Sequence, residues 1–148
     1  MIVGDGPARN QLESLAKEIY PWAEFIGDQR GTELEACFAA ADLFILPGTG
    51  GLAVQQAMAF GLPVIVAEGD GTQDDLVRRE NGWRVPTGDL QALTNTLQTA
   101  LSDPIGLREK GKNAYQIIVE EINLEKMVEA FIEALSSITK LPPGKPMS

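Results

Sequence analysis

Two short apolar runs, separated by a glycine-rich turn and a helical segment, stand at the centre of the chain. Residues 43–46 and 64–66 are apolar at every position, with the sequences Leu-Phe-Ile-Leu and Val-Ile-Val. Continuous apolar runs of this kind are typical of parallel strands that helices cover on both faces. Three glycines between positions 48 and 51 follow the first run, and a helix is expected from Leu52. The pattern predicts two buried strands joined by a turn and a helix.

Residues on both sides of this centre continue the alternation of strands and helices. Apolar positions at helical spacing predict a helix over residues 8–19 and three more helices after Asp89. Short apolar segments over residues 1–3 and 23–27 predict further strands. Strands that alternate with helices indicate an α/β protein with a three-layer α/β/α, doubly wound parallel sheet, a Rossmann-like fold of about five strands.

Capping residues predict where several of these helices begin. Thr32 is expected to cap a helix, with Glu35 completing a capping box, and Asn123 is expected to cap the last helix. The proline-rich end of the chain cannot continue that helix. We therefore expect one domain over residues 1–138 and a flexible tail over residues 139–148.

Composition narrows the function classes. Of the 148 residues, 44% are hydrophobic and 22% charged, as in a soluble globular protein. A net charge of −9 without a Lys/Arg cluster argues against nucleic acid as a partner. No apolar run approaches the roughly 20 residues of a membrane span, so we expect no transmembrane segment. The single cysteine, Cys37, is expected to be a small buried apolar residue and favours a cytoplasmic protein. The absence of histidine excludes His-containing triads and His-based metal sites within this chain.

The glycine-rich turn is the candidate binding site. A turn without side chains at the start of a helix presents free N–H groups and the positive end of the helix dipole at one place, where an anion binds well. The alternative is that the glycines only close a tight connection between a strand and a helix. The residue pattern alone leaves both interpretations open.

Residues 47–66 resemble the donor-binding signature of retaining GT-B glycosyltransferases in the glycosyl transferases group 1 family (family four). That signature has Pro-Ser, a Glu, Gly-Phe-Gly-Leu, a second Glu in Glu-Ala-Met-Ala, and then Gly-Pro-Val. Here Gly51 and Leu52 match Gly-Leu, Gln-Ala-Met-Ala from Gln56 replaces Glu-Ala-Met-Ala, and Gly-Leu-Pro-Val follows in register. Both acidic positions differ, because Gly48 stands at the first and Gln56 at the second.

The resemblance extends through residue 85. Val-Gly-Asp-Gly-Pro at residues 3–7, Phe-Ile-Gly at 25–27 and Asn-Gly-Trp-Arg-Val at 81–85 match family segments. It implies the fold of the C-terminal half of a GT-B enzyme and binding of a UDP- or GDP-linked sugar. No catalytic residue, metal or other cofactor is implied.

The resemblance also implies a role for individual residues. The diphosphate would be bound by Gly50, Gly51 and Leu52, and the sugar and ribose by Gly48, Thr49 and Gln56. The nucleotide base would be held by residues of a second loop, namely Ile26, Gly27, Asp28 and Arg30. For Arg30 the alternatives are contact with a base or phosphate and simple solvation at a turn, which is favoured.

Two other motifs suggest different chemistry. Asp70, Asp74 and Asp75 could suggest a hard cation, but aspartates at a helix N-terminus that complement its dipole are the favoured interpretation. Gly4-x-Gly6 suggests a dinucleotide site, but Arg9 stands where that fingerprint has its third glycine. We therefore expect neither a metal site nor a dinucleotide site.

By the standards of the family, this chain lacks an N-terminal acceptor domain and the first strand of the donor domain. The resemblance implies a glycosyltransferase half that is inactive by itself and needs a separate or upstream acceptor domain. In that case it would be cytoplasmic or peripheral at the inner membrane through that partner domain. The alternative is a non-catalytic nucleotide-sugar-binding module or enzyme remnant. Because the missing strand would lie mid-sheet, we expect residues near Ile2 to pair directly with residues near Phe44.

Overall fold

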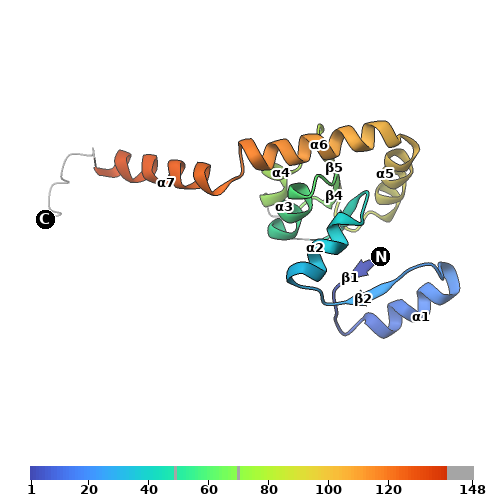
Figure 1. Cartoon of the computed structure of the whole chain (residues 1–148). Helices are drawn as coiled ribbons and strands as arrows, with labels where there is room; N and C mark the ends of the chain where they lie inside the picture. Colours follow the sequence, from blue (N-terminus) through green and yellow to red (C-terminus); the bar gives the residue numbers. More distant parts are fainter. Residues whose placement is uncertain (49, 70, 140–148) are drawn as a thin grey trace, which may run out of the picture. The chain divides into compact units, whose positions relative to one another are not determined.

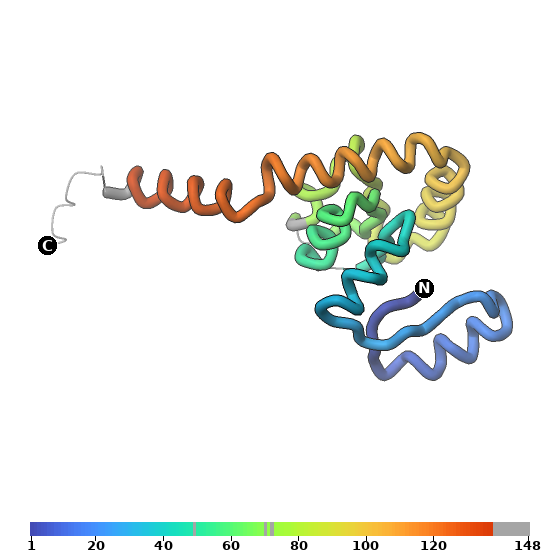
Figure 2. Tube along the Cα trace, in the orientation of Figure 1, coloured from blue at the N-terminus to red at the C-terminus, as the bar shows by residue number. Residues whose placement is uncertain are grey.

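The computed structural model describes residues 1–48, 50–69 and 71–139. The chain divides into two compact units, Met1–Ala40 and Ala41–Ser148 (Figure 1). The order of the elements along the chain can be followed by colour in Figure 2.

The first unit pairs two short parallel strands. Strand β1 is Ile2–Val3, helix α1 is Arg9–Ile19, strand β2 is Phe25–Gly27 and helix α2 is Gly31–Ala39. Ile2 lies opposite Phe25 in the parallel register, and the Ile2 N–H donates to the Glu24 carbonyl at 2.7 Å. The predicted strand at the start of the chain and the helix that follows it are therefore confirmed.

The predicted capping box of α2 is wrong. The helix begins at Gly31, two residues earlier than a cap at Thr32 would place it, and the N-cap position is taken by Arg30, which makes no side-chain cap hydrogen bond. Gly31 has φ +54°, a left-handed conformation that glycine adopts without steric cost. Because the turn into the helix is made by this glycine, Thr32 lies inside the first helical turn and not at its cap.

The second unit is built on a three-stranded parallel sheet that contains both apolar runs, whereas the sequence predicted one sheet of about five strands. Its strands are β3 (Phe44–Leu46), β4 (Val64–Ala67) and β5 (Gly82–Val85), in the order β3-β4-β5. Its helices are α3 (Gly51–Ala59), α4 (Thr72–Leu76), α5 (Leu90–Ser102), α6 (Pro104–Glu120) and α7 (Leu124–Thr139). The parallel pairings and the alternating helices confirm the α/β class.

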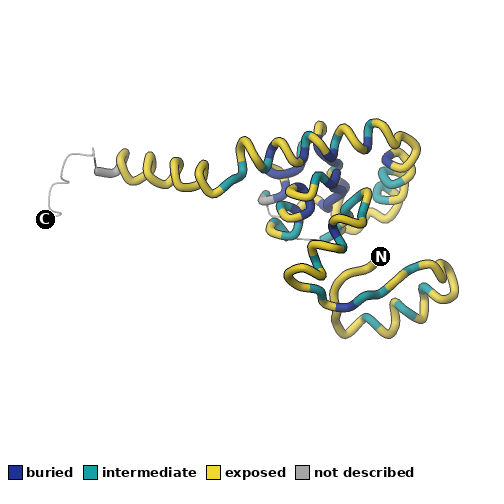
Figure 3. The backbone as a smooth tube through the Cα atoms, viewed as in Figure 1, coloured by how far each residue is buried: buried dark blue, intermediate teal, exposed yellow. Residues whose placement is uncertain are grey.

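The core of this unit surrounds β4, whose four residues are all buried. Some apolar side chains of α3 and α6 are buried as well, and the tube of Figure 3 has dark blue stretches along both helices between exposed and half-buried ones. The buried apolar residues of the two helices are Val54, Ala57, Met58, Leu107, Ala114 and Ile117. The central strand therefore has the full burial that its apolar sequence predicted.

Strand β3 is less buried than its sequence predicted. Phe44 and Leu46 are half-buried, and Ile45 is 39% exposed. The reason is position, because β3 stands at one end of the order β3-β4-β5. An apolar run reports the chemistry of a strand but not whether a neighbouring strand covers its outer edge.

Direct pairing of β1 with β3 is also wrong. Among the described residues, β1 pairs with β2, and β3 pairs with β4, in two separate sheets. The Phe44 N–H donates to the Pro63 carbonyl at 3.0 Å. Each strand thus finds its partner in the next strand along the chain, which is the commonest arrangement.

The last helix, α7, has its predicted cap. The Asn123 Oδ1 atom accepts a hydrogen bond from the Lys126 N–H at 2.8 Å. The side chains of residues 124–137 are all exposed, including those of Met127 and Phe131. No helix among the described residues is long and apolar enough to cross a membrane. The predicted tail, apart from residue 139, lies outside the described residues.

Candidate functional site

The glycine-rich turn joins the carboxyl end of β3 to the start of α3. Helix α3 begins at Gly51, and Gly50 at its N-cap makes no side-chain cap hydrogen bond. A helix start without a side-chain cap leaves its first backbone N–H groups for another acceptor. Such a helix start is the kind of place where an anion can bind, which is the role that the sequence predicted for this turn.

Glycines at this turn have a steric role at one position and leave free space at another. A Cβ atom at Gly50 would lie 3.1 Å from Leu46 Cδ2, tighter than most side-chain contacts. A Cβ atom at Gly48 would meet no atom within 4 Å. The space next to Gly48 is therefore open in the ligand-free chain, whereas Gly50 sits close against β3. Thr49, the third residue of the predicted sugar group, lies outside the described residues.

Leu52 and Gln56 share one exposed face of α3. Leu52 is 72% exposed, and Gln56 lies four residues further on and is also exposed. Residues separated by four positions are neighbours on a helix surface. Gly48 and Gly50 thus lie in the turn, and Gly51, Leu52 and Gln56 lie on the first part of the helix that follows it.

Gln73 contacts this turn and was missed by the sequence analysis. It lies on α4, and its Nε2 atom donates to the Gly48 carbonyl at 2.8 Å. The Gln73 side chain is buried, and its Oε1 atom has no hydrogen-bond partner among the described residues. No local pattern identifies such a residue, because its partner is 25 positions away in the sequence.

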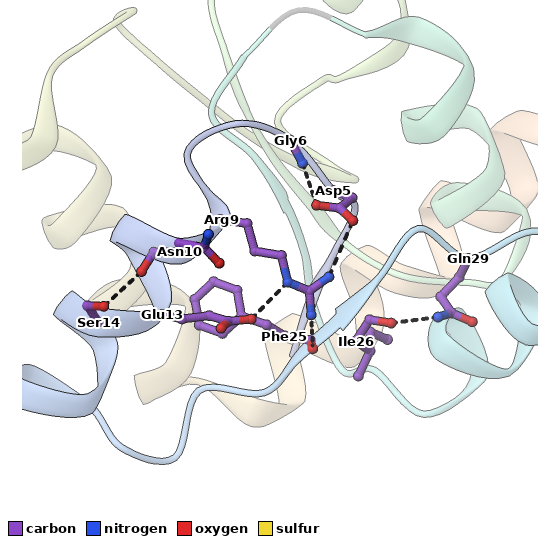
Figure 4. Close-up of polar contacts among 9 residues, drawn as sticks. All are labelled: Asp5, Gly6, Arg9, Asn10, Glu13, Ser14, Phe25, Ile26 and Gln29. Carbon is purple, nitrogen blue, oxygen red and sulfur yellow. Dashed lines mark hydrogen bonds and ion pairs between the residues drawn. The ribbon is translucent and has the colours of Figure 1, made fainter.

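The four residues predicted to hold a base lie in the first unit. Ile26 and Gly27 belong to β2, and the Ile26 carbonyl accepts from Gln29 Nε2 at 2.7 Å (Figure 4). Arg30 forms an ion pair with Asp28 at 2.9 Å, and its side chain is 87% exposed. The guanidinium group is therefore solvated and paired, as the favoured interpretation of Arg30 expected.

Arg9, which replaces the third glycine of the dinucleotide fingerprint, has a structural role. Its Nη2 atom donates to the Phe25 carbonyl at 3.0 Å, and its Nε atom donates to Glu13 at 2.8 Å. Figure 4 shows the guanidinium group between the first turn of α1 and β2, with Asp5 close by at 3.6 Å. The hydrogen bond to Glu13 raises the pKa of Arg9 above its ordinary value. Arg9 therefore ties the first turn of α1 to β2.

The aspartate cluster offers no cation site among the described residues. Asp74 forms an ion pair with Arg84, Asp75 is exposed, and Asp70 lies outside the described residues. No group of three or more acidic, cysteine or histidine side chains in the described part of the chain is arranged to hold a metal ion.

Two hollows of the second unit lie away from the turn. One, of about 760 Å³, is lined largely by apolar residues such as Phe60 and Leu107. The other, of about 400 Å³, has basic residues including Arg84 and Lys110 beside Trp83, and Lys110 Nζ lies 4.8 Å from the indole centroid. Neither hollow contains a residue of the predicted site. The turn is therefore the candidate site because of its uncapped backbone N–H groups and not because it lies in a hollow of the surface.

Comparisons with known proteins agree on one family. The chain is 35% identical over 107 residues to sulfoquinovosyl transferase SQD2 of Arabidopsis thaliana, covering 68% of this chain and 21% of that protein. It is 42% identical over 77 residues to a GDP-mannose-dependent alpha-mannosyltransferase of Mycolicibacterium smegmatis, covering 50% of this chain and 20% of the relative. The chain thus spans about a fifth of these two curated relatives.

Solved structures show the same fold. Sucrose-phosphate synthase from Thermosynechococcus elongatus matches with a TM-score of 0.75 and 28% identity, over 91% of this chain and 38% of that one. HepE from Anabaena, solved in complex with UDP, matches with a TM-score of 0.75 and 25% identity, over 91% of this chain and 40% of that one.

The family model described as "Glycosyl transferases group 1" matches residues 1–103, which include every residue of the predicted site. This match covers more than half of the chain, and the structural neighbours have the GT-B architecture. The chain belongs to the glycosyl transferases group 1 family and has the fold of the C-terminal domain of its GT-B members.

Proposed function

We propose that this chain binds the nucleotide diphosphate of a sugar donor at the turn between β3 and α3. The observation that carries the proposal is the start of α3, where Gly50 provides no side-chain cap for the backbone N–H groups that follow. Together with the helix dipole, these groups favour a bound phosphate. In this proposal the amides of Gly51 and Leu52 donate to the diphosphate, and Gly50 keeps the approach free of a side chain.

The remaining predicted residues would surround the other parts of the donor. Gln56 is exposed one helical turn beyond Leu52, within reach of a ribose placed beside the diphosphate. Gly48 and Thr49 would face the sugar, and Ile26, Gly27, Asp28 and Arg30 would hold the base. No metal ion takes part in this proposed binding.

The reaction would be transfer of the sugar to an acceptor bound by another domain. Similarity to a GDP-mannose-dependent enzyme and to a structure solved with UDP supports a GDP- or UDP-linked donor. Because the chain spans only part of these proteins, turnover would need an acceptor domain, upstream in the same polypeptide or on another chain. Such a protein would work in the cytoplasm, or at the inner membrane where its partner domain binds there.

A second candidate function is non-catalytic binding of a nucleotide sugar. It is favoured by Gly48 and Gln56, which stand where the family signature has two acidic residues. Neither a glycine nor an amide can supply the negative charge of a carboxylate. This candidate shares the diphosphate site with the first, and the two differ only in whether sugar is transferred.

The diphosphate site is tested by calorimetric titration of UDP and GDP. The wild-type chain is compared with Gly51→Val, whose side chain should obstruct the approach to the amides, and with Leu52→Ala, which keeps them. We expect Gly51→Val to abolish nucleotide binding with little change in the circular dichroism spectrum, and Leu52→Ala to bind. Repeating the wild-type titration in EDTA should change nothing. Equal affinity of Gly51→Val and wild type would place the anion elsewhere.

A further inference from the structure

Gln73 connects α4 to the candidate donor turn. Its Nε2 atom donates to the Gly48 carbonyl at 2.8 Å, and the residue is only 1% exposed. The Gly48 carbonyl can only accept, so the amide must present its NH₂ group to it. The orientation of the Gln73 amide is therefore determined by the turn.

This orientation leaves the Oε1 atom of Gln73 without a donor. The atom is buried, and none of the described residues donates a hydrogen bond to it. A buried acceptor without a partner lowers the stability of the folded chain. Asn81, the other buried polar residue, differs because its Oδ1 accepts from the Arg78 N–H and its Nδ2 donates to the Leu76 carbonyl. Stability alone would therefore favour an apolar side chain at position 73 but not at position 81.

The turn itself needs an external constraint. Gly48, Gly50 and Gly51 lie within four positions, and glycine has the least restricted backbone of all residues. A binding loop that is already ordered loses less conformational entropy when its ligand binds. A hydrogen bond from a buried side chain to the first of these glycines supplies such order.

We propose that Gln73 is a positioning residue of the donor turn. Its amide fixes the Gly48 carbonyl and thereby aims the N–H groups at the start of α3 toward the donor diphosphate. The inference rests on the proposed function of the turn. Such a residue is retained at a cost in stability because it improves binding, a trade-off common at functional sites.

The first test replaces Gln73 by the apolar residue of similar length, Gln73→Met, with Asn81→Leu as control. We expect Gln73→Met to unfold at the same urea concentration as wild type or a higher one, while its UDP affinity falls roughly tenfold because the turn must be ordered on binding. Asn81→Leu should lose stability and, while folded, bind UDP like wild type. Lower stability of Gln73→Met with unchanged UDP affinity would overturn the proposal.

The second test uses Gln73→Glu and the pH dependence of UDP binding. A protonated carboxyl group can donate to the Gly48 carbonyl as the amide does, whereas an ionised one repels it. Burial raises the pKa of a carboxyl group at this position. The quantity to compare is the UDP affinity of Gln73→Glu divided by the UDP affinity of wild type at the same pH. This ratio should approach one near pH 5 and fall below one by pH 8.

The outcomes separate this inference from the proposed function. A ratio for Gln73→Glu that does not change with pH would overturn the positioning role while leaving the donor site intact. Equal UDP affinity of wild type and Gln73→Met would do the same. If wild type binds neither UDP nor GDP, the proposed function fails first and the inference fails with it.

Discussion

At Gly111, α6 lies close against the backbone near Gly61, and replacing this glycine by alanine tests how tightly the second unit is packed. The residue is buried, and a Cβ atom there would lie 2.2 Å from the Gly61 carbonyl oxygen and 3.2 Å from Pro63 Cδ. Separations under 3.0 Å are essentially never seen for real Cβ atoms. The atom in the way belongs to the backbone, so it cannot rotate aside as a flexible side chain would.

The size of the effect follows from two opposing contributions. Alanine inside a helix is favoured over glycine by roughly 0.5–1 kcal/mol. Against this, α6 or the Gly61 loop must move by roughly 0.8 Å or more to relieve the contact, and overpacking of this kind costs about 1–3 kcal/mol. We therefore expect Gly111→Ala to lower the free energy of unfolding by about 1–2 kcal/mol, opposite in sign to helix propensity.

The assay can be confined to the second unit because the chain has two tryptophans, one in each unit. In a Trp22→Phe background, Trp83 fluorescence during urea unfolding reports the β5 region alone. Lys112→Ala, at the exposed next position of α6, is the matched control and should change stability by less than about 0.5 kcal/mol. If Gly111→Ala were as stable as its background or more stable, α6 would not be held against the Gly61 loop as described.

Two further predictions concern Gln56 and an ion pair. Because a carboxylate accepts hydrogen bonds from two hydroxyls at once, Gln56→Glu should tighten UDP binding by about 1 kcal/mol in calorimetry, and unchanged or weaker binding would contradict the ribose role. The ion pair joins Glu121 to Arg78, and the hydrogen bond between them lowers the pKa of Glu121. The pair therefore contributes stability above the unfolded-state pKa of a glutamate, about 4.3. That contribution is lost as pH falls through the lower folded-state pKa of Glu121. The urea midpoints of wild type and Glu121→Gln should therefore converge in acid. A difference between the two midpoints that stays constant from pH 7 to pH 3 would argue against the pair.

Much of the fold could be predicted because its signals are local. The order of strands and helices, the start of α3 next to its glycines and the Asn123 cap of α7 all depend on neighbouring residues. The cap of α2 was mispredicted by two positions because Thr32 and Glu35 fit a capping box, while a left-handed glycine just before them set the true start.

Strand neighbours could not be predicted in the same way. The apolar sequence of residues 43–46 suits a strand covered on both faces, but Ile45 is partly exposed at the end of its sheet. Direct pairing of β1 with β3 was inferred from the free-energy cost of an unpaired apolar strand edge. That cost does not determine which strand pairs with the edge. Each strand pairs instead with the one that follows it in the chain, β1 with β2 and β3 with β4.

In the candidate site, too, residues placed by local spacing could be predicted from the sequence, whereas residues placed by distant contacts could not. Gln56 could be placed from the sequence because it lies four positions beyond Leu52 on one helix. Gln73 could not, because only the fold brings a side chain of α4 to the carbonyl of Gly48. Its chemistry in the sequence, a glutamine among aspartates, resembles an ordinary solvated helix start, yet the residue is buried and its Oε1 atom has no partner among the described residues. This buried atom, which no described residue pairs, is therefore the structural observation that adds most to the family signature, because it points to a constraint on the turn that the signature residues do not supply.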